Sequence, residues 1–144
     1  MNEFSILVIC TGNSCRSQMA EGFLKHHAKL MKLNINIYSA GVKAEGLNKK
    51  AVKVMKEIGI DISQHSSNTI DEFNNIQFSH IITVCDHANE NCPVYLKKAH
   101  LTHQNFLDPS KIIGETDLID KAYEKCRDDI GIFTSNYLTK NFND

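Results

Sequence analysis

A cysteine and an arginine six positions apart, Cys10 and Arg16, lie near the start of the chain. The apolar run before them, residues 4–9, is typical of a buried strand, and residues 19–31 have the apolar spacing of a helix. In a loop between a strand end and a helix start, backbone N–H groups can bind a tetrahedral oxyanion. The other loop residues are Thr11, Gly12, Asn13, Ser14 and Cys15. The pattern predicts a nucleophilic Cys10 sulfur facing a phosphate-like anion.

Arg16 and Ser17 complete this predicted site. The planar guanidinium of Arg16 can hold two oxygens of an oxyanion, and Ser17 can donate its hydroxyl to the Cys10 sulfur. A helix N-terminus and a nearby arginine both favour the thiolate, so we expect the pKa of Cys10 to lie below the usual value for a thiol. The alternative is an ordinary strand-to-helix turn, because Gly12 and Asn13 suit a tight turn whatever the chemistry.

The composition is that of an ordinary globular protein of 144 residues, with 42% hydrophobic and 23% charged residues. This length predicts one domain over residues 1–144. The net charge of −1 does not point to nucleic acid or an acidic membrane, and no stretch is long enough to span a bilayer. The first residues lack a signal-peptide pattern, so we expect a cytoplasmic protein. Because structural disulfides are rare there, five cysteines indicate catalysis, redox chemistry or metal binding.

Strand-like and helix-like segments alternate along the chain. Strands are predicted at residues 4–9, 35–39, 80–84 and 99–103. Helices are predicted at residues 19–31, 49–58 and 70–73 and over a long C-terminal segment whose inward face includes Leu118 and Cys126. This alternation predicts an α/β fold, a parallel sheet wrapped by helices with its active site beyond the carboxyl ends of the strands. Cys10 and Cys85 both follow strand ends, so they can meet at one rim.

Cys85 and Cys92 enclose a polar, flexible-looking segment after the third predicted strand. They can be small buried hydrophobic residues, which is common for cysteine. A zinc site through Cys85, His87 and Cys92 is disfavoured, because structural zinc needs four ligands and the spacing is unusual. A polar segment between two cysteines suits thiols that move.

The residues CTGNSCRSQMAE at positions 10–21 closely resemble the signature of the low-molecular-weight tyrosine phosphatase superfamily. More narrowly, they resemble the signature of the thioredoxin-coupled arsenate reductases. The resemblance continues through residues 38–41, 60–63 and 108–109 and weakens in the C-terminal helix. It implies a single three-layer domain in which a four-stranded parallel sheet is flanked by helices.

The resemblance also implies residue roles. Asp108, otherwise part of a common Asp-Pro turn, matches the general acid that protonates the leaving oxygen. Cys10 would attack arsenate, and Cys85 and Cys92 match two electron-carrying thiols that end as a disulfide reduced by thioredoxin. Cys15 and Cys126 are expected to pack and not to react. The resulting hypothesis is a monomeric arsenate reductase for arsenic detoxification, with weak phosphatase activity. The alternatives are a tyrosine phosphatase that uses Cys10 alone and a non-enzymatic oxyanion-binding or redox-sensing module.

No metal or organic cofactor is expected, although some members of the family bind potassium near the loop. Asn13, Glu21 and Ser39 match its ligands, whereas Asn68 stands where the family pattern has an aspartate. The missing charge predicts a weakened response to potassium. His65 matches a position near this site and is equally well a surface or capping histidine.

Overall fold

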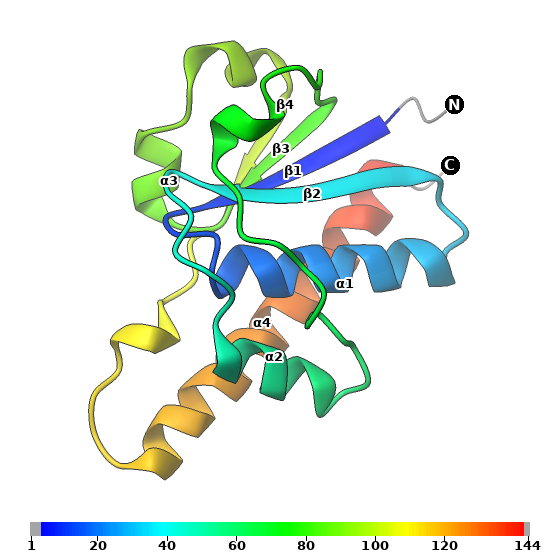
Figure 1. Ribbon diagram of the computed structural model, residues 1–144. Helices are drawn as coiled ribbons and strands as arrows, with labels where there is room; N and C mark the ends of the chain where they lie inside the picture. The colour runs from blue at the N-terminus through cyan, green and yellow to red at the C-terminus, as the bar shows by residue number, and fades with distance from the viewer. Residues whose placement is uncertain (1–3, 143–144) are drawn as a thin grey trace.

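A parallel four-stranded sheet forms the centre of the protein (Figure 1). The computed structural model describes residues 4–142. Strand β1 (Phe4–Cys10) lies between β2 (Ile35–Gly41) and β3 (His80–Thr83), and β4 (His100–His103) pairs with β3 at the edge. The expected α/β fold, a four-stranded parallel sheet flanked by helices, is confirmed.

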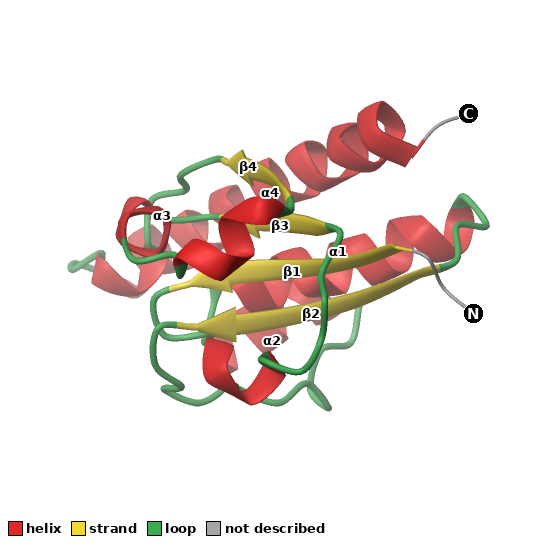
Figure 2. Ribbon diagram, turned by 90° about the horizontal axis from the view of Figure 1, so that it is seen from above, coloured by secondary structure: helices red, strands yellow, loops and turns green. Residues whose placement is uncertain are grey.

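Helices lie on both faces of the sheet (Figures 1 and 2). Below the strands in Figure 1 are the three longest helices, α1 (Arg16–Leu30), α2 (Lys49–Lys56) and α4 (Thr116–Phe142). Above them are shorter elements, including η1 (Ile70–Phe73), α3 (Asp86–Glu90) and η2 (Val94–Lys98). A further short turn, η3 (Pro109–Lys111), precedes α4. The result is the three-layer arrangement in which site residues gather at the carboxyl ends of parallel strands.

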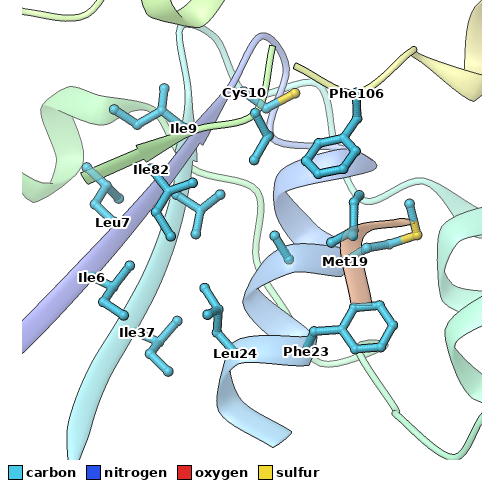
Figure 3. Close-up of a cluster of buried hydrophobic side chains, with 14 of the residues drawn as sticks. Ile6, Leu7, Ile9, Cys10, Met19, Phe23, Leu24, Ile37, Ile82 and Phe106 are labelled. Carbon is cyan, nitrogen blue, oxygen red and sulfur yellow. The ribbon is translucent and has the colours of Figure 1, made fainter. Parts of the chain in front are cut away.

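The central strand β1 is apolar at consecutive positions because helices cover both of its faces. The side chains from Ile6 to Ile9 are completely buried. Met19, Phe23 and Leu24 of α1 pack against this part of the sheet, and Figure 3 shows Cys10 and Phe106 at one end of the same cluster. The nucleophile candidate therefore lies at the edge of the rigid core.

The helix boundaries differ from the sequence expectation in instructive ways. Helix α1 begins at Arg16, three residues earlier than predicted, because its first turn buries polar side chains that interrupt the apolar pattern. Gly59, at φ +83°, follows the end of α2, as expected of a residue that stops a helix. Leu118 is 55% exposed, so its predicted core position is wrong. It lies in the first turn of α4, whereas Cys126 is buried as expected.

The segment between Cys85 and Cys92 is helical, which corrects the interpretation of it as a flexible-looking loop. The Cys85 sulfur caps α3 by accepting a hydrogen bond from the Ala88 N–H at 3.4 Å. Helix η2 follows directly after Pro93. The sequence did not predict this helix, because the groups that hydrogen-bond to its polar residues lie elsewhere in the chain.

Candidate active site

The loop from Cys10 to Arg16 lies between the end of β1 and the start of α1. Its carbonyl oxygens accept hydrogen bonds from the segment after β2: Cys10 from Val42, Thr11 from Lys43, Gly12 from Glu45 and Ser14 from Asn48, at 2.9 to 3.2 Å. With the carbonyl groups engaged on the outside, the loop can present N–H groups to an anion on the inside. This is the predicted oxyanion-binding geometry.

Asn13 holds the centre of the loop. Its backbone is left-handed, at φ +46°, a conformation that asparagine tolerates better than most residues. The buried side chain donates to Ser17 Oγ at 2.8 Å and to Ser39 Oγ at 2.9 Å, and it accepts from the Asn68 N–H at 2.7 Å. Ser17 Oγ thus accepts a hydrogen bond from the loop, and among the described residues it makes no hydrogen bond to the Cys10 sulfur, in contrast to the prediction.

The structure brings Cys85 to Cys10 at the rim of the sheet, as their strand-end positions predicted. The two thiols lie close enough to change each other's pKa, and Thr11 Oγ1, next to Cys10 in the chain, lies 3.2 Å from Cys85 Sγ. Each cysteine is only 3% exposed. Their proximity follows from topology, since β1 and β3 are neighbours in the sheet, Cys10 ends β1, and Cys85 comes two residues after the end of β3.

Proton affinity is divided unequally between these thiols. The hydrogen bond from Cys10 lowers the pKa of Cys85 to about 5 against the opposing effect of burial, and hydrogen bonds from Thr11 and Ala88 add to the effect. The same contact with Cys85 raises the pKa of Cys10, burial raises it further, and Arg16 opposes both. In this arrangement the neighbouring thiol, which the sequence expectation omitted, therefore opposes the acidity expected for Cys10.

Arg16 links the loop to Asp108, which is 92 positions away in sequence. The buried guanidinium donates to the Phe106 carbonyl oxygen at 2.8 Å, and its other terminal nitrogen lies 3.4 Å from Asp108 Oδ2. Asp108 Oδ1 accepts hydrogen bonds from the backbone and the hydroxyl of Ser110. A cavity of about 480 Å³ has Cys10, Arg16 and Asp108 in its wall, so the predicted nucleophile, anion ligand and acid share one space.

Three further cysteines are Cys92, Cys126 and Cys15, and Cys15 lines the same cavity as Cys10. All five lie in the described part of the chain and are free thiols. Cys92 is buried two residues after the end of α3, and burial raises its pKa. Burial also raises the pKa of Cys15, and it raises that of Cys126 to about 12. Such thiols are poor nucleophiles where they lie, which agrees with the packing role expected for the last two.

The residues that match potassium ligands are hydrogen-bonded to one another, and Glu21 is also paired with Lys25. Glu21 Oε1 accepts from Ser39 Oγ at 2.5 Å, and Glu21 Oε2 is paired with the Lys25 ammonium group at 2.5 Å. The Asn68 side chain is turned towards Ser66 and Glu72. Within residues 4–142, no cluster of three or more His, Cys, Asp or Glu side chains could hold a metal ion.

Lys25 and His65 border this position. Sequence reasoning missed Lys25, although its spacing of four residues from Glu21 on a helix was a usable signal. His65 Nε2 lies 3.7 Å from Glu21 Oε2, and its Nδ1 lies 3.0 Å from Gln18 Oε1. Burial lowers the pKa of His65, and the ring packs beside the carboxylate, so it is not a surface histidine.

Residues 5–138 match the low molecular weight phosphotyrosine protein phosphatase family, and the chain belongs to this family. An arsenate reductase of Halalkalibacterium halodurans is 44% identical over 91% of this chain and 92% of its own length. An arsenate reductase of Staphylococcus aureus is 41% identical over 97% of this chain and all of its own length. The solved structure of an arsenate reductase in its phosphate-binding state superposes with a TM-score of 0.76 at 26% identity, covering 95% of this chain and 98% of that one. None of the described helices is long and apolar enough to cross a membrane.

Proposed function

We propose that this protein is an arsenate reductase that converts arsenate to arsenite with three thiols, those of Cys10, Cys85 and Cys92. The observation that carries the proposal is the position of Cys85, which contacts Thr11 of the loop and lies close enough to Cys10 to change its pKa. A phosphatase on this scaffold needs Cys10 alone, whereas a reductase needs a second thiol within reach of the first. Relatives that match more than nine-tenths of the chain are named arsenate reductases, which supports the same conclusion.

The first step is attack of the Cys10 sulfur on arsenic. The loop N–H groups and Arg16 hold the arsenate oxygens, and transfer of the Cys10 proton to Cys85 within the thiol pair supplies the attacking thiolate. An arsenate oxygen leaves as water after it takes a proton from Asp108. The contact between Arg16 and Asp108 keeps this acid at the cavity, and the Ser110 hydrogen bonds orient its carboxyl group.

The next steps transfer two electrons from sulfur to arsenic. Cys85 first loses the proton that it took from Cys10 to water. The Cys85 thiolate then attacks the Cys10 sulfur, and the sulfur–arsenic bond breaks with its electron pair staying on arsenic. Arsenite leaves and a Cys10–Cys85 disulfide forms. Cys92 then attacks Cys85, releasing Cys10 as a thiolate and leaving a Cys85–Cys92 disulfide. Because Cys92 is buried and separated from Cys85 by α3, this exchange requires the helix to open.

A dithiol carrier such as thioredoxin completes the cycle by reducing the Cys85–Cys92 disulfide. We propose that the protein works in the cytoplasm as a monomer, since thiols that must be reduced after each turnover suit a reducing compartment. We further propose that potassium is not needed for turnover, because Lys25 already supplies a positive charge to Glu21. No step of the reaction uses a metal.

Weak phosphatase activity is a second expected property of the same cavity. Cys10, Arg16 and Asp108 are the groups that hydrolysis of a phosphate ester requires, and none of them depends on the relay thiols for its position in the wall. Phosphate and arsenate share shape and charge, so the loop binds both. This activity should survive in Cys85→Ser and Cys92→Ser.

The deciding assay measures arsenate-dependent NADPH consumption with thioredoxin and thioredoxin reductase present. Wild type should turn over many times, Cys92→Ser should release arsenite once and stop as a Cys10–Cys85 disulfide, and Cys85→Ser should not complete one turnover. Cys126→Ser is the matched control and should keep full activity. Phosphatase turnover without arsenate-dependent NADPH consumption in wild type would assign the protein to the phosphatases instead.

A further inference from the structure

We propose that His103 latches helix α3 in its reduced, helical form and thereby sets the reduction potential of the Cys85–Cys92 pair. The proposal rests on the thiol relay of the proposed function. It concerns a positioning residue, since His103 contacts neither of the relay sulfurs. The latch consists of Thr83, Asp86, Asn89, His103 and Asn105.

His103, the last residue of β4, joins the sheet to the first turn of α3. Its Nε2 lies 2.8 Å from Asp86 Oδ1, and its Nδ1 lies 2.7 Å from Thr83 Oγ1. Thr83 is completely buried at the end of β3, so the imidazole is anchored to the most rigid part of the molecule. The relay helix is therefore attached to the sheet through a side chain that takes no part in the thiol chemistry.

Two weaker ties lie beside this contact. The Thr83 hydroxyl lies 3.4 Å from Asn89 Oδ1, one turn further along α3, and Asn105 Oδ1 accepts from the Asp86 N–H at 3.0 Å. Asn105 belongs to the loop that continues to Phe106, whose carbonyl oxygen binds Arg16. The relay helix is thus held by the same loop that contributes to the oxyanion site.

Helix α3 lies between Cys85 and Cys92 and opposes a disulfide between them. Six residue steps separate Cys85 from Asn91, the two caps of α3, and at about 1.5 Å per residue they span about 9 Å. A disulfide requires Cα atoms within about 7 Å of each other. Asp86 and Asn89 lie in the stretch that must change shape, so their contacts with His103 and Thr83 stabilise the reduced form alone. Removing the latch should therefore favour oxidation.

The expected size of the effect follows from the exposure of the pair. The side chains are 28% exposed at His103 and 68% at Asp86, so the energy of their contact is modest, and the hydrogen bond between His103 and Thr83 adds to it. Together they should change the equilibrium constant for disulfide formation about fivefold. For a two-electron couple, at about 30 mV per tenfold, loss of the two contacts therefore lowers the reduction potential by about 20 mV.

The test equilibrates full-length protein carrying Cys10→Ser with mixtures of reduced and oxidised glutathione. Oxidation removes two electrons and two protons from Cys85 and Cys92, and the oxidised glutathione takes them up as two thiols. The disulfide fraction is measured by mass spectrometry after the free thiols are trapped. Adding His103→Ala should make the disulfide about fivefold more favoured. His100→Ala on the same strand, whose ring contacts His80, is the control and should leave the equilibrium unchanged.

Asp86→Asn provides a second variant at an exposed position, and it should move the potential in the same direction by a smaller amount. Faster hydrogen exchange of the α3 amides in reduced His103→Ala, but not in His100→Ala, would support the latch. An unchanged or higher potential in both His103→Ala and Asp86→Asn would overturn the latch while leaving the relay intact. Absence of any Cys85–Cys92 disulfide in the Cys10→Ser parent would overturn the relay and the latch together.

Discussion

Replacing Lys25 tests the inference that this ammonium group occupies the role of a cation beside the oxyanion loop. The Glu21 side chain is only 10% exposed, and its two oxygens are partnered by Ser39 and Lys25. Lys25→Ala leaves one carboxylate oxygen without its charged partner in a nearly buried position. Because Ser39 also binds Asn13, the disturbance reaches the loop that holds the anion.

The magnitude follows from the burial of Glu21. A surface ion pair contributes at most about 1 kcal/mol, and removing the partner of a buried charge costs about 3 to 5 kcal/mol. Lys25 is 48% exposed, so we expect an intermediate loss of about 2 kcal/mol in the free energy of unfolding. For a protein of 144 residues, this lowers the melting temperature by roughly 6 °C.

The assay compares melting temperatures in equal concentrations of potassium and sodium chloride. The melting temperature of wild type should differ by less than about 1 °C between the two salts, because an ion can displace the Lys25 ammonium group only by breaking its ion pair with Glu21. Lys25→Ala should be stabilised by potassium relative to sodium, since Glu21, Ser39 and Asn13 are then free to contact an ion. Lys29→Ala, an exposed lysine of the same helix, should show neither effect. A large potassium-specific rise in wild type, or no loss of stability in Lys25→Ala, would refute the reasoning.

Further predictions concern the thiol pair, the loop and the acid. In Cys85→Ser the pKa of Cys10 should fall, because the interaction that raises it most is lost. The pH profile for alkylation of Cys10 should then move to lower pH. An unmoved profile would show that Cys85 does not raise the pKa of Cys10. In wild type, alkylation mapped by mass spectrometry should show Cys85 titrating near pH 5, and a midpoint near 9 would argue against the shared proton. Gly41→Ala should lose several kcal/mol in the free energy of unfolding or fail to fold, because an added Cβ would lie 2.7 Å from the Asn13 nitrogen and closer still to a neighbouring carbonyl oxygen. Near-native stability of this variant in a denaturant titration would be inconsistent with this packing. Asp108→Asn should lower the phosphatase and reductase rates by about 10²-fold or more, while the variant should still bind the oxyanion. Rates near those of wild type would show that Asp108 is not the general acid.

The local pattern of residues was enough to predict the α/β class, the four parallel strands and the loop at Cys10. Apolar runs of strand length, helical spacing and Gly59 depend on neighbours in sequence, so they carry this information directly. The spacing of Cys10 and Arg16, together with the family signature around them, was enough to predict Cys10 as the nucleophile and Arg16 as the residue that binds the anion. The meeting of Cys10 and Cys85 was also predictable, because parallel strands end at one rim.

Tertiary structure alone decided how these groups affect one another. The pKa of Cys10 depends on a thiol 75 positions away, and the order of α3 depends on His103 and Asn105 in other elements. The partner of Ser17 was likewise set by which side chain packed closest. Hydrogen bonds and charges act over a few ångströms, and only the folded chain determines which residues lie within that distance. The sequence therefore identified the chemical groups, and packing determined where the proton and the charge reside.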